Sequence, residues 1–252
     1  MSTILAIANQ KGGVGKTTTA INLGAGLGAL ERRVLLVDCD PQGNATRGLG
    51  IKAEPPHLYH ALTGEAEIAE TIRSTNFPNL DLIPSQRDLV GVEVEFVGEK
   101  GWEGRLKKNL RQLSDRYDTI LIDCPPSLGH LTVSALTAAD GLIVPLQCEY
   151  FALEGISELM STVKRIQGGL NTRLNIAGIL LTMYDDRTNL SRDVADEIRR
   201  HFGAKVFQTV VPRNIRLAEA PSHGLPIFQY DIKSRGAEAY LALAREFLRR
   251  AA

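Results

Sequence analysis

The stretch Gln10-Lys11-Gly12-Gly13-Val14-Gly15-Lys16-Thr17-Thr18-Thr19 joins a short apolar run, residues 3–8, to residues 17–30, which predict a helix. The apolar run predicts a strand. A glycine-rich loop between a strand and a helix N-terminus turns free backbone N–H groups toward an anion, and the helix dipole favours negative charge there. The stretch therefore predicts a phosphate-binding loop and, with it, an α/β fold.

The residues of this loop suit the phosphates of a nucleotide. Its three glycines let the backbone come close to the ligand. Lys16 supplies a mobile positive charge for the β- and γ-phosphates, and the Thr17 hydroxyl is placed to ligate Mg²⁺. The predicted nucleotide-binding residues of the loop are Lys11, Gly12, Gly13, Val14, Gly15, Lys16, Thr17 and Thr18.

The loop departs from the strict phosphate-loop pattern at one position. That pattern has glycine six residues before Lys16, where this chain has Gln10. The chain also carries a second lysine, Lys11, in the first turn of the loop. Since Lys16 already serves the nucleotide of its own chain, Lys11 is either a solvated surface lysine or a ligand for phosphate elsewhere.

Seven short apolar runs alternate with helical stretches along the chain: residues 4–8, 34–38, 80–84, 119–123, 141–145, 176–183 and 206–211. Such runs predict a mostly parallel, twisted sheet of about seven to eight strands with helices on both faces. Ligands of these sheets bind at the carboxyl ends of the strands. Because no linker or repeat interrupts the sequence, we expect residues 1–252 to form a single domain.

Charge and cysteine content narrow the class of protein. The formal net charge is zero, but residues 187–252 carry 12 Lys/Arg and 7 Asp/Glu, whereas residues 1–186 carry 17 and 22. Three cysteines without a Cys-x-x-Cys pair argue against a disulfide framework and a zinc site, and we expect Cys39 and Cys124 to be small buried side chains. No apolar run approaches 18 residues, and the N-terminal run is too short for a signal peptide. These features predict a cytoplasmic protein.

Three aspartates follow predicted strands. Asp38 ends the strand at residues 34–38, where a helix cap or turn residue is as good an interpretation as a functional one. Asp40, two residues on, is a carboxylate that near a γ-phosphate could position or activate water and hold Mg²⁺. Asp123 ends the strand at residues 119–123 in a Walker-B pattern, whose carboxylate holds Mg²⁺ directly or through water. The predicted metal ligands are Thr17, Asp40 and Asp123.

The C-terminal part of the chain carries the excess of positive charge. Any one of these cations can be an ordinary solvated side chain, but together they could neutralise DNA phosphates without reading the base sequence. The candidate DNA-binding residues are Arg187, Arg192, Arg213, Arg216, Lys233 and Arg235. The closing helix, residues 234–251, has an apolar stripe that we expect to dock on the sheet.

Several motifs together resemble the ParA/MinD ATPases. Residues 11–18, Lys-Gly-Gly-Val-Gly-Lys-Thr-Thr, resemble the deviant Walker A loop of that family, and Asn9-Gln10 resembles its ParA (Soj) branch. Asp-x-Asp-Pro-Gln-Gly-Asn at 38–44 and Asp-x-Pro-Pro-Ser at 123–127 resemble its two switch segments. Val-Val-Pro-Arg-Asn at 210–214 resembles the segment that packs around adenine. The resemblance covers nearly the whole chain.

The resemblance implies an ATPase that uses ATP and Mg²⁺ in chromosome or plasmid partition. It implies that Lys11 reaches the nucleotide of a second subunit, that Asp40 positions or activates the attacking water, and that Lys11, Lys16 and Asp40 are the catalytic residues. Pro212 and Asn214 would contact the adenine base, although a strand-ending turn is as good an interpretation on physical grounds. The implied partners are a second copy of the chain, non-specific double-stranded DNA and a ParB-like centromere-binding protein, with a nucleoid location.

Two other functions compete with partition. A MinD-like ATPase would position a machine at the membrane, but it would need a terminal amphipathic helix, which the final residues do not supply. A metabolic enzyme of the same ATPase class, such as an amidoligase or a cluster carrier, would need a substrate pocket or a cysteine pair. We expect neither in this sequence.

Overall fold

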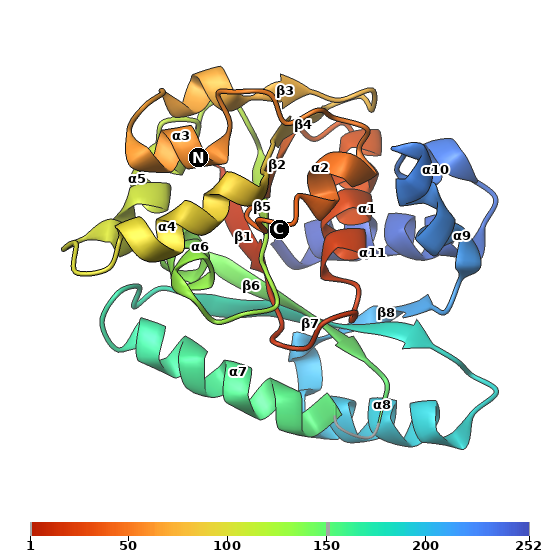
Figure 1. The fold of residues 1–252 in the computed structure, drawn as a ribbon. Coiled ribbons are helices and arrows are strands. Elements are labelled where there is room, and N and C mark those ends of the chain that lie inside the picture. Colours follow the sequence, from red (N-terminus) through yellow and green to blue (C-terminus); the bar gives the residue numbers. More distant parts are fainter. Residues whose placement is uncertain (1, 150–151, 252) are drawn as a thin grey trace.

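One eight-stranded sheet runs through the computed structural model, which describes residues 2–149 and 152–251 (Figure 1). The strand order is β3-β4-β2-β5-β1-β6-β7-β8, and all neighbours are parallel except β3, which pairs antiparallel with β4. The strands are β1 (Thr3–Ile7), β2 (Val34–Asp38), β3 (Arg73–Ser74), β4 (Leu80–Ile83), β5 (Thr119–Asp123), β6 (Gly141–Gln147), β7 (Asn175–Tyr184) and β8 (Val206–Pro212).

Helices cover both faces of this sheet. On one face pack α3 (Leu58–Thr63), α4 (Gly91–Glu95), α5 (Arg105–Arg111), α6 (His130–Ala138), α7 (Ala152–Gln167) and α8 (Asn189–Phe202). On the other pack α1 (Lys16–Ala29), α2 (Asn44–Gly48), α9 (Ile215–Glu219), α10 (Ile227–Tyr230) and α11 (Arg235–Ala251). In β1, Ile4 and Ala6 point to the first core while Leu5 and Ile7 point to the second. This burial on both faces explains why the strands are continuously apolar.

The expected fold class is confirmed, and all seven predicted strands are present. The prediction missed β3, because two residues, Arg73 and Ser74, are too few to form a sequence pattern. Cys39 and Cys124 are 0% and 1% exposed, and burial raises the pKa of both thiols, as expected for small core side chains. In the described ranges, no helix is both long and apolar enough to cross a membrane.

The closing helix docks on the sheet as expected, with Tyr240, Ala244 and Phe247 buried in the second core. Its Glu246 also protects the edge strand β8. The Glu246 carboxylate accepts hydrogen bonds from Gln208 N and Thr209 N, both at 2.8 Å, and pairs with Arg250 at 2.7 Å. Edge strands leave N–H groups unpaired, and here a carboxylate from the helix satisfies two of them.

Replacing Glu246 by alanine is expected to lower the free energy of unfolding by about 2–4 kcal/mol, because two N–H groups and one guanidinium lose their acceptor. Glu238→Ala, on an exposed position of the same helix, should change it by less than about 0.5 kcal/mol. Burial opposes ionisation of Glu246, but its hydrogen bonds hold the pKa below the ordinary 4.5. The stabilisation is therefore present above pH 4.5 and fades as the pH falls through the folded value. Urea unfolding at two pH values measures both effects, and equal stability of the two variants would contradict the role of Glu246.

Candidate functional site

The phosphate loop lies between β1 and α1 and is held from three sides. Gly13 and Gly15 have φ of 74° and 88°, a backbone region that favours glycine, and Lys16 begins α1. The Asn9 side chain accepts from Lys11 N at 3.0 Å and donates to Pro145 O at 2.8 Å, which ties the loop to β6. Thr182 of β7 donates to Val14 O at 2.9 Å. The loop is thus shaped before any ligand binds.

The Lys16 ammonium folds back over this loop. It donates to Lys11 O at 3.0 Å, and the residue is only 7% exposed. Burial lowers the pKa of Lys16, while Asp123, Cys124 and Asp40 oppose that change. A buried ammonium with one backbone acceptor can gain a phosphate as a further partner, and the anion would favour its charged form, which burial disfavours.

A cavity of about 500 Å³ opens in front of the loop. Its walls combine the loop with the start of α1, α2 and the segments after β2 and β5. The lining residues include Gly12, Gly13, Gly15, Lys16, Thr17, Thr18, Asp40, Asn44, Arg47 and Pro126. The structure therefore brings six of the eight predicted loop residues and Asp40 into one site at the carboxyl ends of the strands. The other two do not line it, because Val14 is buried and Lys11 lies outside the cavity.

Asp123 is the most unusual charge at this site. It is fully buried, and among the described residues neither of its carboxylate oxygens makes a hydrogen bond of ordinary length and angle, although the Thr17 side chain is close enough to interact with it. Burial and the neighbouring charge of Asp38 raise the pKa of Asp123 well above its ordinary value, while the Thr17 side chain and the Lys16 ammonium oppose that rise. Buried polar groups without partners are rare, and a cation beside this carboxylate would satisfy it. Asp123 and Thr17 thus fit a Mg²⁺ site.

Asp38 lies beside Asp123 in the register of β2 and β5, but it has a structural role. Its Oδ2 accepts from Thr46 N at 2.8 Å and from Thr46 Oγ1 at 2.6 Å, and its Oδ1 accepts from Asp40 N at 3.2 Å. Burial raises the pKa of Asp38 to about 6. The capping interpretation of Asp38 therefore agrees with the structure, since its carboxylate holds the first turn of α2.

Asp40 faces the cavity from the turn that follows β2. Its Oδ1 accepts from Gln42 N at 2.9 Å, and its main-chain oxygen accepts from Ser85 Oγ at 2.9 Å. The residue is 7% exposed and lines the cavity with Lys16 and Thr17. A carboxylate anchored by one oxygen can use the other toward water or a metal ion.

Lys11 points away from the cavity of its own chain. Its ammonium pairs with Glu149 at 2.9 Å, and the two side chains are 41% and 45% exposed. Glu149 also accepts from Gln147 at the end of β6. Lys11 is thus a surface lysine in an exposed ion pair, and such a pair is held weakly enough to be exchanged for another anion.

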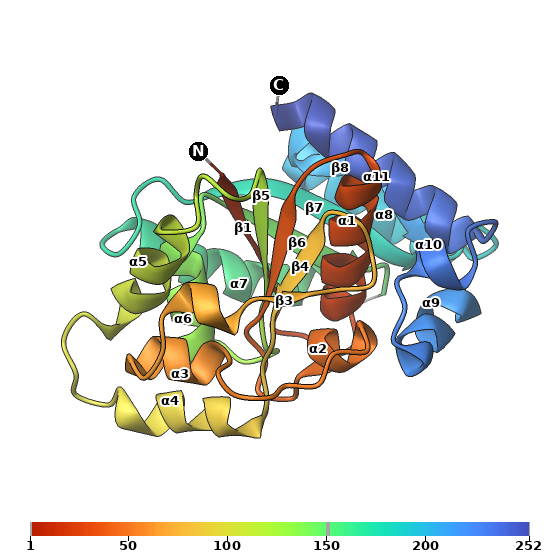
Figure 2. The ribbon, with the colours of Figure 1, turned by 90° about the horizontal axis from the view of Figure 1, so that it is seen from above.

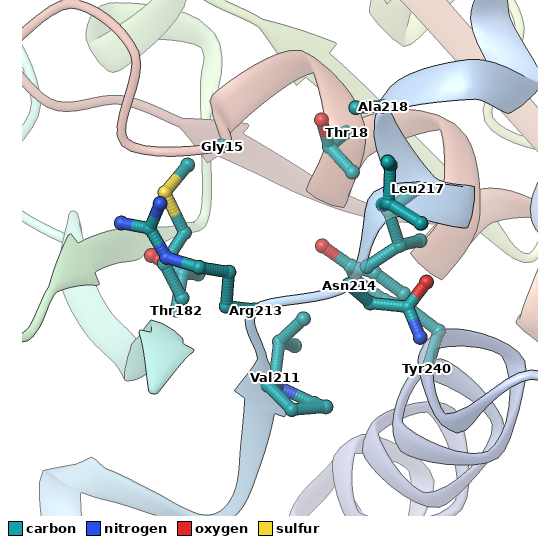
Figure 3. A pocket seen from close by; sticks show the side chains of 12 residues that line it. Gly15, Thr18, Thr182, Val211, Arg213, Asn214, Leu217, Ala218 and Tyr240 are labelled. Carbon is teal, nitrogen blue, oxygen red and sulfur yellow. The ribbon is translucent and has the colours of Figure 1, made fainter. Parts of the chain in front are cut away.

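A second cavity, of about 380 Å³, adjoins the loop. Figure 3 shows Gly15 and Thr18 on one side of it and Val211 and Asn214 on the other. Pro212 also lines it, so both residues predicted to contact adenine are present. Asn214 Oδ1 caps α9 by accepting from Arg216 N at 2.9 Å. The strand-ending turn and the predicted adenine contact of Asn214 are compatible. The helix cap uses the Asn214 oxygen and leaves the amide nitrogen as a donor.

Met183 is a cavity residue that no sequence pattern predicts. It lines both cavities and has a φ of 50°. It follows the loop anchor Thr182 near the end of β7. Only the parallel topology places a residue so far along the chain against the phosphate loop.

The candidate DNA-binding residues do not form one continuous patch. Arg187, Arg213 and Arg235 line a groove beside β8, together with Asp185, Asp186 and Glu238. Arg187 is paired with Asp185, and Arg216 with Glu219 and Asp231. Arg192 on α8 donates to the neutral Asn189, and Lys233 is exposed between α10 and α11. In the described ranges, no ion pair involves Arg213, Lys233 or Arg235, which leaves these three cations available to phosphate.

The chain is similar over most of its length to a family model and to several known proteins. A family model described as an AAA domain matches residues 2–176. The sporulation initiation inhibitor protein Soj of Bacillus subtilis is 56% identical over 248 residues, which cover 98% of each chain. The chromosome partitioning protein ParA of Myxococcus xanthus is 54% identical over 98% of this chain and 88% of its own length.

Solved structures share the fold over the full chain. Cobyrinic acid a,c-diamide synthase from Mycobacterium smegmatis, with bound ADP and magnesium, has a TM-score of 0.88 and 39% identity, and the match covers 100% of this chain and 96% of that one. The septum site-determining protein MinD of Pyrococcus horikoshii, complexed with Mg-ADP, has a TM-score of 0.81 and 29% identity, with coverage of 100% and 98%. These similarities extend well beyond the loop, to every element around the two cavities.

Proposed function

This chain belongs to the ParA/Soj family of chromosome-partitioning ATPases, and we propose that its ATP-bound form pairs with a second copy and binds double-stranded DNA without reading its sequence. Hydrolysis, stimulated by a ParB-like centromere-binding protein, then releases the DNA. The observation that carries this proposal is a cavity lined by the phosphate loop and Asp40, with the buried Asp123 carboxylate next to Lys16 and Thr17, in a chain that matches Soj over 98% of its length. In the cell such a protein would be found on the nucleoid.

Nucleotide binding uses both cavities. The triphosphate lies on the backbone of residues 12–18 with Lys16 against its β- and γ-phosphates, and adenine enters the cavity lined by Pro212 and Asn214. Thr17 and Asp123 would hold Mg²⁺, with Asp40 available as a further ligand. The metal ion supplies neutralisation of the charge that develops on the phosphates.

Hydrolysis rests on positioning and electrostatics rather than on covalent chemistry. Asp40 is fixed by Gln42 and Ser85, so its carboxylate can hold the attacking water or accept a proton from it. Asp40 follows the end of β2 and Asp123 is the last residue of β5, so both lie at the edge of the sheet where the γ-phosphate would bind. Loss of that phosphate would release both segments, which is how hydrolysis would end pairing and DNA binding.

DNA binding gives the first test of this function. We expect the protein to bind non-specific duplex DNA with ATP but not with ADP or without nucleotide, and to lose affinity steeply with salt. The double variant Arg213→Ala/Arg235→Ala should weaken binding and lower the slope of log K against log salt by about 1 for each phosphate that it no longer neutralises. Arg32→Ala, an exposed cation just beyond the C-terminal end of α1, is the matched control and should leave the slope unchanged.

The alternatives make different predictions in the same experiment. If no nucleotide state binds DNA but ATP drives binding to anionic liposomes, a MinD-like function replaces the proposal. The docked stripe of α11 argues against that, because its apolar residues already pack in the core. The diamide synthase neighbour raises an amidoligase function, which would require turnover to depend on an acid substrate and an amide donor. ATP turnover that responds to DNA and a ParB-like protein would exclude it.

A further inference from the structure

The cavity in front of the phosphate loop, here the phosphate cavity, is lined by a cation that the mechanism above does not use. Asn44 and Arg47 of α2 both line this cavity, and as residues three apart they share one face of the helix. Thr46, between them, is buried and donates its hydroxyl to Asp38 instead. Figure 2, like Figure 1, shows α2 beside α1, the helix that begins with Lys16. Arg47 therefore faces the space in which we expect the phosphates of the nucleotide.

The Arg47 guanidinium has donors left for an anion. Its Nη2 donates to Asn44 Oδ1 at 2.8 Å, which is a neutral acceptor, and the residue is exposed. Among residues 2–149 and 152–251, no ion pair involves Arg47. A guanidinium carries five N–H donors in a planar fork that matches the oxygens of a phosphate. Because only one of these donors is used within the described ranges, the others can bind a ligand.

Close contacts fix α2, and with it Arg47, at the edge of the cavity. Gly43, before the helix, has a φ of 61°, and a Cβ there would lie 2.8 Å from Ser85 O. A Cβ at Gly48, in the last turn, would lie 2.7 Å from Ile21 Cδ1 of α1. Between these two contacts, Thr46 Oγ1 accepts from Ser85 N at 3.0 Å. A ligand of Arg47 therefore needs to order one side chain and not the helix that carries it, which lowers the cost of binding.

The charges around the cavity favour a second cation beside the phosphates. Lys16 and Arg47 are the only cations among the described residues that line the phosphate cavity. Asp40 lines it too, and the Asp123 carboxylate lies next to Lys16. Without Arg47, one ammonium would face two carboxylates before the nucleotide adds its own negative charge. A guanidinium on α2 offsets part of that charge, and its hydrogen bonds to phosphate would be charge-assisted.

We propose that Arg47 is a phosphate ligand of the bound nucleotide, and that its guanidinium exchanges the Asn44 oxygen for phosphate oxygens when ADP or ATP binds. This inference rests on the proposed function, because it adds a residue to that same nucleotide site. The exchange is favourable since a hydrogen bond between two charged groups replaces one to a neutral amide. Arg47 N donates to Gly43 O at 3.0 Å and Gly43 N donates to Asp40 O at 2.8 Å, so the contact would also hold the Asp40 turn beside the nucleotide.

The test measures the affinity of the full-length, nucleotide-free protein for Mg-ADP and for a non-hydrolysable ATP analogue with Mg²⁺, by calorimetry without DNA or partner protein. Arg47→Ala should weaken both by about tenfold or more, the effect of losing a charge-assisted hydrogen bond. Arg47→Lys keeps the charge but loses the fork, and its affinity should lie between those of Arg47→Ala and the wild type. Lys52→Ala is the matched control, because Lys52 is an exposed cation five residues further on that lines neither cavity, and its affinity should equal that of the wild type.

Two further measurements separate a ligand from other roles of Arg47. Urea unfolding without nucleotide should give Arg47→Ala the midpoint of the wild type, because only one exposed hydrogen bond is lost. A lowered midpoint together with the lost affinity would make Arg47 a structural residue and overturn the inference. ADP affinity of Arg47→Ala within about twofold of the wild type would overturn it as well, and so would slower ATP turnover at unchanged affinity, which would restrict Arg47 to the transition state. If the wild type itself binds neither nucleotide, the proposed function fails, and the inference fails with it.

Discussion

Asp40→Ala is expected to bind ATP and to pair with a second copy, yet to turn ATP over at least about 100-fold more slowly, the usual contribution of a positioned general base. The carboxylate is 7% exposed, lines the cavity with Lys16 and Thr17, and is fixed by Gln42 N. Steady-state phosphate release, measured beside nucleotide affinity, separates a catalytic loss from a binding loss. Turnover that remains undiminished would remove Asp40 from the mechanism.

Asp40→Asn is the control for a purely structural role. An asparagine side chain can still accept from Gln42 N, so it keeps the turn but loses the charge and the proton acceptor. If Asp40 acts on water or Mg²⁺, Asp40→Asn should be nearly as slow as Asp40→Ala. Recovery of wild-type turnover in Asp40→Asn would instead show that only the turn matters.

Asp38 and Asp40 show a limit of what residue type and spacing can predict about the site. Both follow one strand, and residue type and spacing alone cannot decide which one faces the ligand. The structure favours Asp40, because the Asp38 carboxylate accepts two hydrogen bonds from Thr46 of α2 while Asp40 lines the cavity. The phosphate loop needed no such help, since its glycines, Lys16 and Thr17 act within ten consecutive residues.

The features of the site that the sequence did not predict are contacts between residues far apart in the chain. Glu149 lies 138 residues from Lys11, and Glu93, which accepts from His130 N, lies 37 residues from it, so no local pattern predicts either pair. The exposed apolar face of α4 could not be predicted from a local pattern either. Its composition is mixed Val and Glu, and only the packing of Leu89, Val92 and Phe96 reveals that the other valines face outward. The strands were predictable because burial on both faces leaves a continuous apolar run in each.

Lys11→Ala is expected to keep its affinity for ATP but to weaken ATP-dependent pairing by about tenfold or more. Each charge-assisted hydrogen bond contributes about 1.5–3 kcal/mol, and two-fold symmetry places the contact in the pair twice, for about 3–6 kcal/mol in all. To make it, Lys11 of each copy must leave Glu149, but an exposed pair is worth at most about 1 kcal/mol, or about 2 kcal/mol for both copies, so a net gain of about 1–6 kcal/mol remains. The exchange therefore favours the partner's phosphate whenever ATP is present.

Glu149→Gln tests this exchange from the other side. Freed from its ion pair in both copies, Lys11 should favour pairing, by less than about 30-fold, since only two weak exposed contacts have been removed. Sedimentation velocity with ATP and with ADP, over a range of protein concentrations, measures both variants on one scale. Normal pairing of Lys11→Ala would show that the lysine does not cross to the second copy. Loss of pairing in Glu149→Gln would show that the ion pair belongs to the assembled form, because the carboxylate would then hold Lys11 in place beside the second nucleotide rather than away from it.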